Sequence, residues 1–259
     1  MRHDPTHTGQ QKFAWREVDR AEQPKRGAED RITDFHEIYS LLDEATIREQ
    51  ANRCVQCVSP SCVTGCPLGN NIPAWISLAA EGRFLEAAEA SRATSSMPEI
   101  CPRVCPQERL CEGACVIHAP EEPVCIGAIE KFINEYALAH GAGQIPLAPP
   151  NGKRVAVVGA GPGGLACADV LSQLGYSVTV FESQMLPGGL LLFGIPAFKL
   201  GKEVVERRVN ILKQQRVEFK VGVTVGKDIG LDGLLKEYQS VFLGIGALKP
   251  KALDVPGAE

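Results

Sequence analysis

The segment from Arg154 to Glu182 constrains the fold of this chain more than any other part of the sequence. An apolar, β-branched run is followed by a glycine-rich turn, a stretch with helical spacing of apolar residues, and a second apolar run that ends on an acid. Strand, turn, helix and strand in this order form a βαβ unit, whose two strands pair in parallel. We therefore predict an α/β domain with a parallel sheet over residues 153–259.

The turn of this unit, residues 159–164, has the sequence GAGPGG, which predicts a dinucleotide site in a Rossmann-like domain. Gly159 allows the tight turn, Gly161 lets the backbone approach a pyrophosphate, and Gly164 lets the helix pack against the strand. Glu182, which lies 23 residues after Gly159, is placed to accept hydrogen bonds from a ribose. The alternative is a purely structural turn without a ligand. The predicted cofactor-binding residues of the turn are Gly159, Ala160, Gly161, Pro162, Gly163 and Gly164.

The composition is that of an ordinary globular protein and argues against several classes of partner. The 259 residues are 44% hydrophobic and 22% charged, with a formal net charge of −4. A small negative charge gives no reason to expect nucleic acid or an anionic membrane as a partner. No run approaches the roughly 18 apolar residues of a membrane span, and the first residues lack the apolar region of a secretory signal. We therefore expect no membrane association and a cytoplasmic location.

Nine of the ten cysteines lie between Cys54 and Cys125, in a chain expected in a reducing compartment, where disulfides are rare. Eight of these nine form two sets with the spacings C-x2-C-x4-C-x3-C-P and C-x3-C-x5-C-x3-C. Two sets of four thiolates suit two [4Fe–4S] clusters, each of which takes four ligands. The first set comprises Cys54, Cys57, Cys62 and Cys66, and the second set comprises Cys101, Cys105, Cys111 and Cys115.

Zinc is the main alternative for these cysteines. Structural zinc sites usually pair two short hooks across a longer gap, often with His among the ligands. Here each set has four cysteines in close sequence, prolines follow three of them, and His118 is the sole His nearby. The spacing therefore favours iron–sulfur clusters. Cys125 and Cys167, outside the two sets, are interpreted as packing residues.

The division of the cysteines between the two clusters follows from Pro67. In two-cluster ferredoxins, the cysteine that precedes the proline binds the other cluster. By this rule Cys66 joins the second set, and one member of the second set, Cys115, crosses to the first. The predicted groups are Cys54, Cys57, Cys62 and Cys115 for one cluster, and Cys66, Cys105 and Cys111 with either Cys101 or another residue for the other.

Cysteine density and breaks in the pattern divide the chain into four parts. Residues 1–33 are polar and lack a period, so we expect an arm that lies on a neighbouring domain or subunit, with a disordered tail as the alternative. Helical spacing that begins at Asp34 predicts an α-helical domain over residues 34–141. Residues 142–152 are rich in Gly and Pro and predict a linker to the nucleotide domain.

Four longer motifs follow one another between residues 30 and 259. They are NNIPAWISLAAEGRFLEA from Asn70, CPRVCPQERLCEGACVIH from Cys101, GAGPGG from Gly159 and GGLLLFGIPAFKL from Gly188. Together they resemble the small (β) subunit family of NADPH-dependent glutamate synthase. The resemblance extends to a wider group, which includes the flavin–iron-sulfur half of dihydropyrimidine dehydrogenase and the large subunit of electron-bifurcating ferredoxin:NADP oxidoreductases.

The resemblance implies FAD at the glycine turn, in a glutathione-reductase-type domain, and two [4Fe–4S] clusters in the helical domain. It implies flavin contacts along residues 188–199, including Gly189 and Leu190, with Lys199 on a phosphate. It also implies that the backbone at Val225 meets the adenine.

In the dihydropyrimidine dehydrogenase relatives, a side-chain amide at a similar position completes the second cluster, so Glu130 is a candidate in place of Cys101. Gly246 belongs to the turn that leads toward an NADPH domain. That domain and a final flavin segment are missing here, so we expect an incomplete FAD domain and no activity of this chain by itself.

The function implied by the resemblance is electron transfer from NADPH, through FAD and the two clusters, to a glutamate synthase large subunit that makes glutamate from glutamine and 2-oxoglutarate. We find no acid–base or nucleophile constellation, and we therefore expect no catalytic side chain. One alternative is a related reductase that serves pyrimidine reduction or ferredoxin. A non-enzymatic alternative is an iron–sulfur adaptor that only docks a partner.

Overall fold

The computed structural model of the chain describes residues 13–119, 121–142, 146–247, 249, 252 and 254–257. The beginning of the predicted arm, residues 143–145 of the predicted linker and several of the last residues lie outside the described part. The chain divides into two compact units. The first unit comprises Met1–Ile145 and Ile195–Val205, and the second comprises Pro146–Gly194 and Glu206–Glu259.

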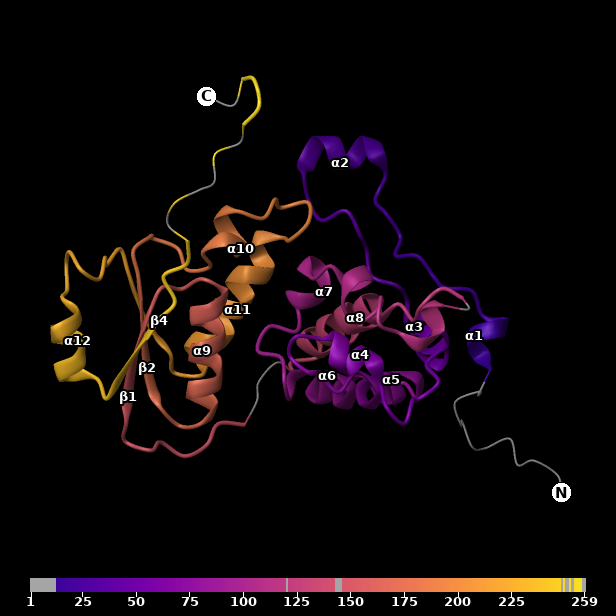
Figure 1. The fold of residues 1–259 in the computed structure, drawn as a ribbon, viewed down its shortest axis with the longest axis horizontal. Helices are drawn as coiled ribbons and strands as arrows, with labels where there is room; N and C mark the ends of the chain where they lie inside the picture. Colours follow the sequence, from indigo (N-terminus) through magenta and orange to yellow (C-terminus); the bar gives the residue numbers. More distant parts are fainter. Residues whose placement is uncertain are drawn as a thin grey trace. The chain divides into compact units, whose positions relative to one another are not determined.

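The first unit is helical, and Figure 1 shows α3, α5, α6 and α8 gathered in one bundle. Its core contains Trp75, Ile76 and Ile129, which are fully buried, and an edge-on pair of Phe84 and Phe132 with ring centroids 5.0 Å apart. The longer helices are α3 (Glu44–Asn52), α5 (Ile72–Ala80), α6 (Phe84–Arg92) and α8 (Ile126–Ala139). The short elements are α1 (Ala14–Glu17), α2 (Ala28–Asp34), α4 (Ser61–Gly65), α7 (Cys101–Val104), η1 (Gln107–Arg109) and η2 (Val116–His118). The prediction of a helical domain is confirmed.

Local sequence explains where two of these helices begin. Asp43 caps α3, because its carboxylate accepts a hydrogen bond of 2.8 Å from the backbone N–H of Thr46. Helix α5 has Pro73 in its first turn, where a missing N–H costs nothing.

The helix predicted to start at Asp34 is wrong over its first part, because α2 ends at Asp34 and α3 begins ten residues later at Glu44. Phe35 has a left-handed backbone with φ of 56°, which ends α2. Backbone N–H groups of the residues that follow donate to carbonyls far away in the sequence, and not to the carbonyls of a helical turn. The N–H of Ile38 donates to Phe198 O at 3.0 Å, and the N–H of Ser40 donates to Pro24 O at 2.9 Å.

The second unit contains a four-stranded parallel sheet with the order β3–β2–β1–β4. Figure 1 shows α9 and α12 on opposite sides of this sheet. The strands are β1 (Arg154–Val158), β2 (Ser177–Glu182), β3 (Glu218–Val221) and β4 (Ser240–Leu243). The helices of this part of the chain are α9 (Pro162–Gln173), α10 (Leu190–Phe193), α11 (Lys202–Gln214) and α12 (Leu231–Glu237). Helix α11 begins in the first unit and continues into the second. The prediction of a Rossmann-like parallel sheet is confirmed.

The register of the sheet places the glycine turn beside the acid. Val158, the last residue of β1, pairs with Phe181, so that the carboxyl ends of β1 and β2 lie next to each other. One face of these strands packs on α12, through Leu234 and Tyr238. Ligands of open α/β sheets bind at such carboxyl ends. Within the described ranges, no helix combines the length and the apolar character needed to cross a membrane.

Candidate functional site

Four cysteines from both sets line one cavity in the first unit. Cys54, Cys57 and Cys62 come from the first set, and Cys115 crosses to them from the second. The same cavity thus brings together four thiols from two segments of the chain. A donor set of four thiols around a space fits a [4Fe–4S] cluster.

Gly65, the last residue of α4, allows Cys115 to reach this cavity. A Cβ atom at Gly65 would lie 2.7 Å from Cβ of Ala114 and 2.9 Å from the carbonyl oxygen of Leu110, so a side chain does not fit there. In addition, the hydroxyl of Ser61 donates a hydrogen bond to the carbonyl of Ala114. The two cysteine segments are therefore in direct contact just before Cys115.

Burial changes the pKa of two thiols of this first group. Together with a smaller contribution from the neighbouring thiols, it raises the pKa of Cys54 to about 11 and that of Cys62 to about 12, so both are protonated at neutral pH. Gln56 lies beside them, with Nε2 at 3.5 Å from Sγ of Cys54. Because metal ligands are thiolates, assembly of a cluster here must release protons.

The second group of side chains contains both candidates for the fourth ligand, Glu130 of α8 and Cys101 of α7. Cys66, Cys105, Cys111 and Glu130 lie close enough to influence one another's charge, and Cys101 hydrogen-bonds to Cys105. That hydrogen bond raises the pKa of Cys101 and lowers that of Cys105, while burial raises the pKa of Cys111 to about 12. The assignment of either group as cluster ligands stays a prediction.

Glu130 lies in a buried polar network that no sequence motif marks. Burial raises the pKa of its carboxyl well above the usual value, and the nearby Cys101 raises it further, while a hydrogen bond from Ser91 lowers it. Ser91 and Asn134 are fully buried, and Asn134 Nδ2 donates to Ser91 Oγ at 3.3 Å. Asn70 Nδ2 donates to the Ser91 carbonyl at 3.0 Å. Ser91 therefore connects the carboxyl to the helix core.

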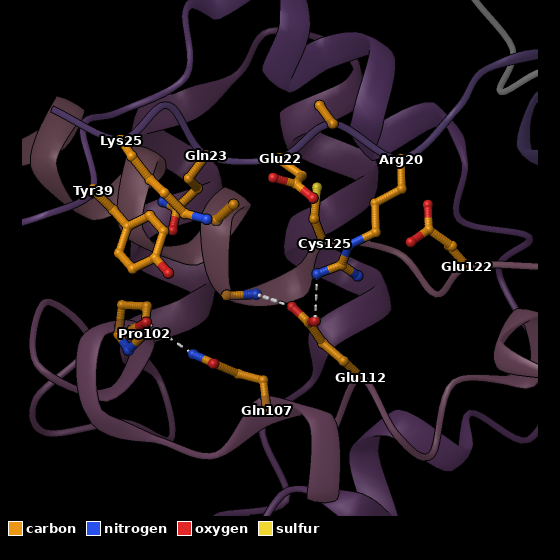
Figure 2. A pocket seen from close by; sticks show the side chains of 13 residues that line it. Arg20, Glu22, Gln23, Lys25, Tyr39, Pro102, Gln107, Glu112, Glu122 and Cys125 are labelled. Atoms are coloured by element: carbon orange, nitrogen blue, oxygen red, sulfur yellow. Dashed lines mark hydrogen bonds and ion pairs between the residues drawn. The ribbon is translucent and has the colours of Figure 1, made fainter. Parts of the chain in front are cut away.

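Another cavity, of about 310 Å³, is lined in part by Pro102, Gln107 and Glu112 of the second cysteine segment, and Figure 2 shows its lining. Glu112, next to Cys111, accepts a hydrogen bond of 2.7 Å from Nη2 of Arg20 and one of 2.9 Å from the N–H of Gly127. These contacts, drawn as dashed lines in Figure 2, tie the cysteine segment to the arm and to the start of α8. Sequence reasoning missed Glu112, because its partners are 92 and 15 residues away.

In the second unit, the glycine turn has the shape that a dinucleotide needs. Gly159 has a φ of +98°, and a Cβ at Gly164 would lie 1.8 Å from the carbonyl oxygen of Gly159. A Cβ atom at Gly163, in contrast, would meet no atom outside its own turn of helix within 4 Å, so the N-terminus of α9 is open on this side. Its unpaired N–H groups and the positive end of the helix dipole attract phosphate. Pro162 is the first residue of α9.

Glu182 supports the glycine turn directly, which sequence reasoning did not predict. Its buried carboxylate accepts hydrogen bonds from the N–H of Ala160 at 2.7 Å, from the N–H of Gln184 at 2.8 Å and from the hydroxyl of Ser183 at 3.1 Å. A carboxylate has about four acceptor positions, so these three bonds leave one for a ribose hydroxyl. The predicted ribose contact stays a prediction.

The structure places the other predicted flavin residues as follows. Gly189 has a φ of +51°, and a Cβ there would lie 2.7 Å from Cα of Gly161, so it packs on the glycine turn, and Leu190 beside it is exposed. Val225 forms an isolated bridge with Ile229. Lys199 belongs to the first unit, where it lines a cavity with Glu37 and Arg103, and Gly246 has a φ of +67° in the second.

Two family models match the chain. The model described as dihydropyrimidine dehydrogenase domain II, 4Fe-4S cluster, matches residues 31–142, and the model described as NAD(P)-binding Rossmann-like domain matches residues 157–216. The first match covers both cysteine sets, and the second covers the glycine turn and Glu182.

Several curated proteins are similar over most of the chain. The glutamate synthase [NADPH] small chain of Escherichia coli is 47% identical over 89% of this chain and 49% of its own length. The protein of the same name from Azospirillum brasilense is 46% identical over 90% of this chain and 49% of its own. The putative oxidoreductase AegA of E. coli is 44% identical over 93% of this chain and 37% of its own. The chain thus spans about half the length of its glutamate synthase relatives.

Proposed function

Because the chain belongs to the family of the glutamate synthase [NADPH] small chains, we propose that it holds the redox cofactors of an electron-transfer subunit. The observation that carries this proposal is the grouping of cysteines from both sets around one cavity, within a domain whose family model is a 4Fe-4S domain. Bound FAD would accept a hydride from NADPH, and bound clusters would carry single electrons away.

The proposed ligands follow the two groups of thiols. One [4Fe–4S] cluster would be held by Cys54, Cys57, Cys62 and Cys115, and the other by Cys66, Cys105 and Cys111 with Glu130 or Cys101. In both groups the protein supplies thiols that are close in space and partly shielded from water. The pKa values of Cys54, Cys62 and Cys111, which burial raises, mean that these three thiols stay protonated until metal binds.

We assign FAD to the glycine turn, although the matching family model is described as NAD(P)-binding. The open N–H groups at the start of α9 would bind the pyrophosphate, and Glu182 would hold both the turn and the ribose. Gly189 completes the cradle, because its close approach to Gly161 leaves no room for a side chain. Leu190, Lys199, Val225 and Gly246 are proposed cofactor contacts on the resemblance alone.

The proposed electron donor is NADPH, and the proposed acceptor is a glutamate synthase large chain. The names of the relatives support this pairing, since a small chain implies a large one. A second candidate is a reductase that serves another acceptor. It is supported by AegA and UacF of E. coli, putative oxidoreductases that are each 44% identical to this chain.

Co-expression separates the two candidates. The protein should be co-expressed with a glutamate synthase large chain from the same organism, and the product should be isolated through a tag on the small chain. A stoichiometric complex that forms glutamate from glutamine, 2-oxoglutarate and NADPH supports the first candidate. A protein that carries flavin and clusters, reduces a dye with NADPH and binds no such large chain supports the second.

A further inference from the structure

Glu37 lies at the centre of a buried ionic network in the first unit. Its Oε1 accepts a hydrogen bond of 2.6 Å from Nε of Arg103, and its Oε2 lies 3.2 Å from Nζ of Lys131. Arg103 also pairs with Glu135 at 2.9 Å, and Lys131 Nζ donates to the carbonyl of Tyr39 at 2.8 Å. The side chains of Arg103 and Lys131 are only 7% and 6% exposed, so the pairs are little screened by water.

The same carboxylate holds a segment that is far away in the sequence. Oε1 of Glu37 accepts a hydrogen bond of 3.0 Å from the N–H of Gly201. The N–H of Ile38, the next residue, donates to the carbonyl of Phe198, also at 3.0 Å. Glu37 and Ile38 therefore fix both ends of the segment Phe198–Gly201, which contains the last three residues of the GIPAFKL motif. A cavity of about 410 Å³ lies beside it, lined in part by Glu37, Arg103 and Phe198.

Arg103 connects this segment to the second cysteine group. It lies in α7, between Cys101 and Cys105, and its Nη1 donates to the carbonyl of Glu99 at 2.6 Å. Burial alone would raise the pKa of Glu37, but the N–H of Gly201 and the charge of Arg103 outweigh it and lower the pKa. The carboxylate is therefore charged at neutral pH, and its loss would remove one counter-charge from the buried side chains of Arg103 and Lys131.

We propose that Glu37 is a positioning residue, which fixes the segment Phe198–Gly201 to the cysteine segment Cys101–Cys105. This inference rests on the proposed function, in which that cysteine segment binds the second cluster and the GIPAFKL motif contacts the flavin. One carboxylate oxygen, shared by Arg103 and Gly201, then holds the two segments against each other.

Amide hydrogen exchange of the full-length protein tests directly whether Glu37 fixes this segment. Glu37→Ala removes the acceptor, and we expect the exchange at Gly201 and Ile38 to become about tenfold faster or more. Glu37→Gln keeps an oxygen acceptor but loses the charge, so an intermediate increase is expected, and it replaces the Ala variant if that variant does not fold. Glu135→Gln is the matched control, since it removes a charge that also pairs with Arg103 but leaves the carboxylate that accepts the N–H of Gly201 in place.

Two spectroscopic readouts distinguish positioning from a merely structural role. In Glu37→Ala, the EPR signal and the reduction potential of the second cluster should change, while the signal of the first cluster stays that of the unsubstituted protein. The inference is overturned if Gly201 and Ile38 exchange in Glu37→Ala as slowly as in Glu135→Gln, or if both clusters change equally. Iron and flavin contents of the unsubstituted protein test the proposed function separately from the positioning role of Glu37.

Discussion

At the scale of single residues, the glycines of the cofactor turn have different reasons to be glycine. A side chain at Gly164 would collide with the Gly159 carbonyl at 1.8 Å, within the protein itself. A side chain at Gly163 would meet no protein atom within 4 Å. The first is therefore required by the fold of the βαβ unit, and the second leaves space at the open end of α9, where a phosphate would bind.

This difference predicts the outcome of a matched pair of substitutions. Gly164→Ala should lower the free energy of unfolding by roughly 1–3 kcal/mol or more, because the backbone must shift to relieve the collision. Gly163→Ala should change it by less than about 1 kcal/mol, as is usual for an exposed helical position. Urea unfolding followed by circular dichroism measures both. Equal losses in the two variants would contradict the packing of α9 on β1 described above.

At the scale of elements, local patterns predicted the parts of the fold that local patterns control. The βαβ unit was predictable because strand and helix periods, a glycine turn and a final acid follow one another within one short segment. The segment after α2 was not, because Ile38 bonds to Phe198 and Ser40 bonds to Pro24. No periodicity records such pairings.

For the candidate sites too, the sequence indicated local features but not contacts between distant residues. The eight cysteines were visible in the sequence, since ligand spacing is local. The residues that support them were not. Glu112 is held by Arg20, Glu130 is held by Ser91, and Glu37 holds Gly201, and each of these pairs joins positions far apart along the chain. Only the folded chain brings them together.

The crossing of the two cysteine segments predicts which substitutions act alike. Cys66 precedes Cys105 by 39 residues, yet both belong to the second group, so Cys66→Ala and Cys105→Ala should disturb the same EPR signal. Cys54→Ala should disturb the other signal, together with Cys115→Ala. Cys167→Ala, in α9, serves as the control and should leave both signals unchanged. If Cys66→Ala instead affects the signal lost in Cys54→Ala, the proposed division of ligands is wrong.

At the scale of the whole molecule, the two units have separate means of stability. The second unit contains a parallel sheet with its own apolar contacts, such as those of Phe181 and Tyr238, and none of the eight cysteines. The first unit buries a helical core, but the segments that carry its cysteines are short helices and turns. Bound clusters would therefore stabilise the first unit selectively, since binding energy to a folded site is folding energy.

Removal of iron should accordingly destabilise one unit only. After anaerobic treatment with a strong chelator, we expect faster protease cleavage in residues 54–66 and 101–115, while residues 154–194 and 206–243 of the second unit stay as resistant as before. Limited proteolysis with mass spectrometry measures both regions in one sample. Cleavage that increases equally in the sheet would show that the units do not unfold separately.

The central claim is that the first unit holds two [4Fe–4S] clusters, and metal analysis of the anaerobically purified protein tests it most directly. We expect roughly eight irons and eight acid-labile sulfides per chain, with two EPR signals after reduction. Stoichiometric zinc without acid-labile sulfide would contradict the claim.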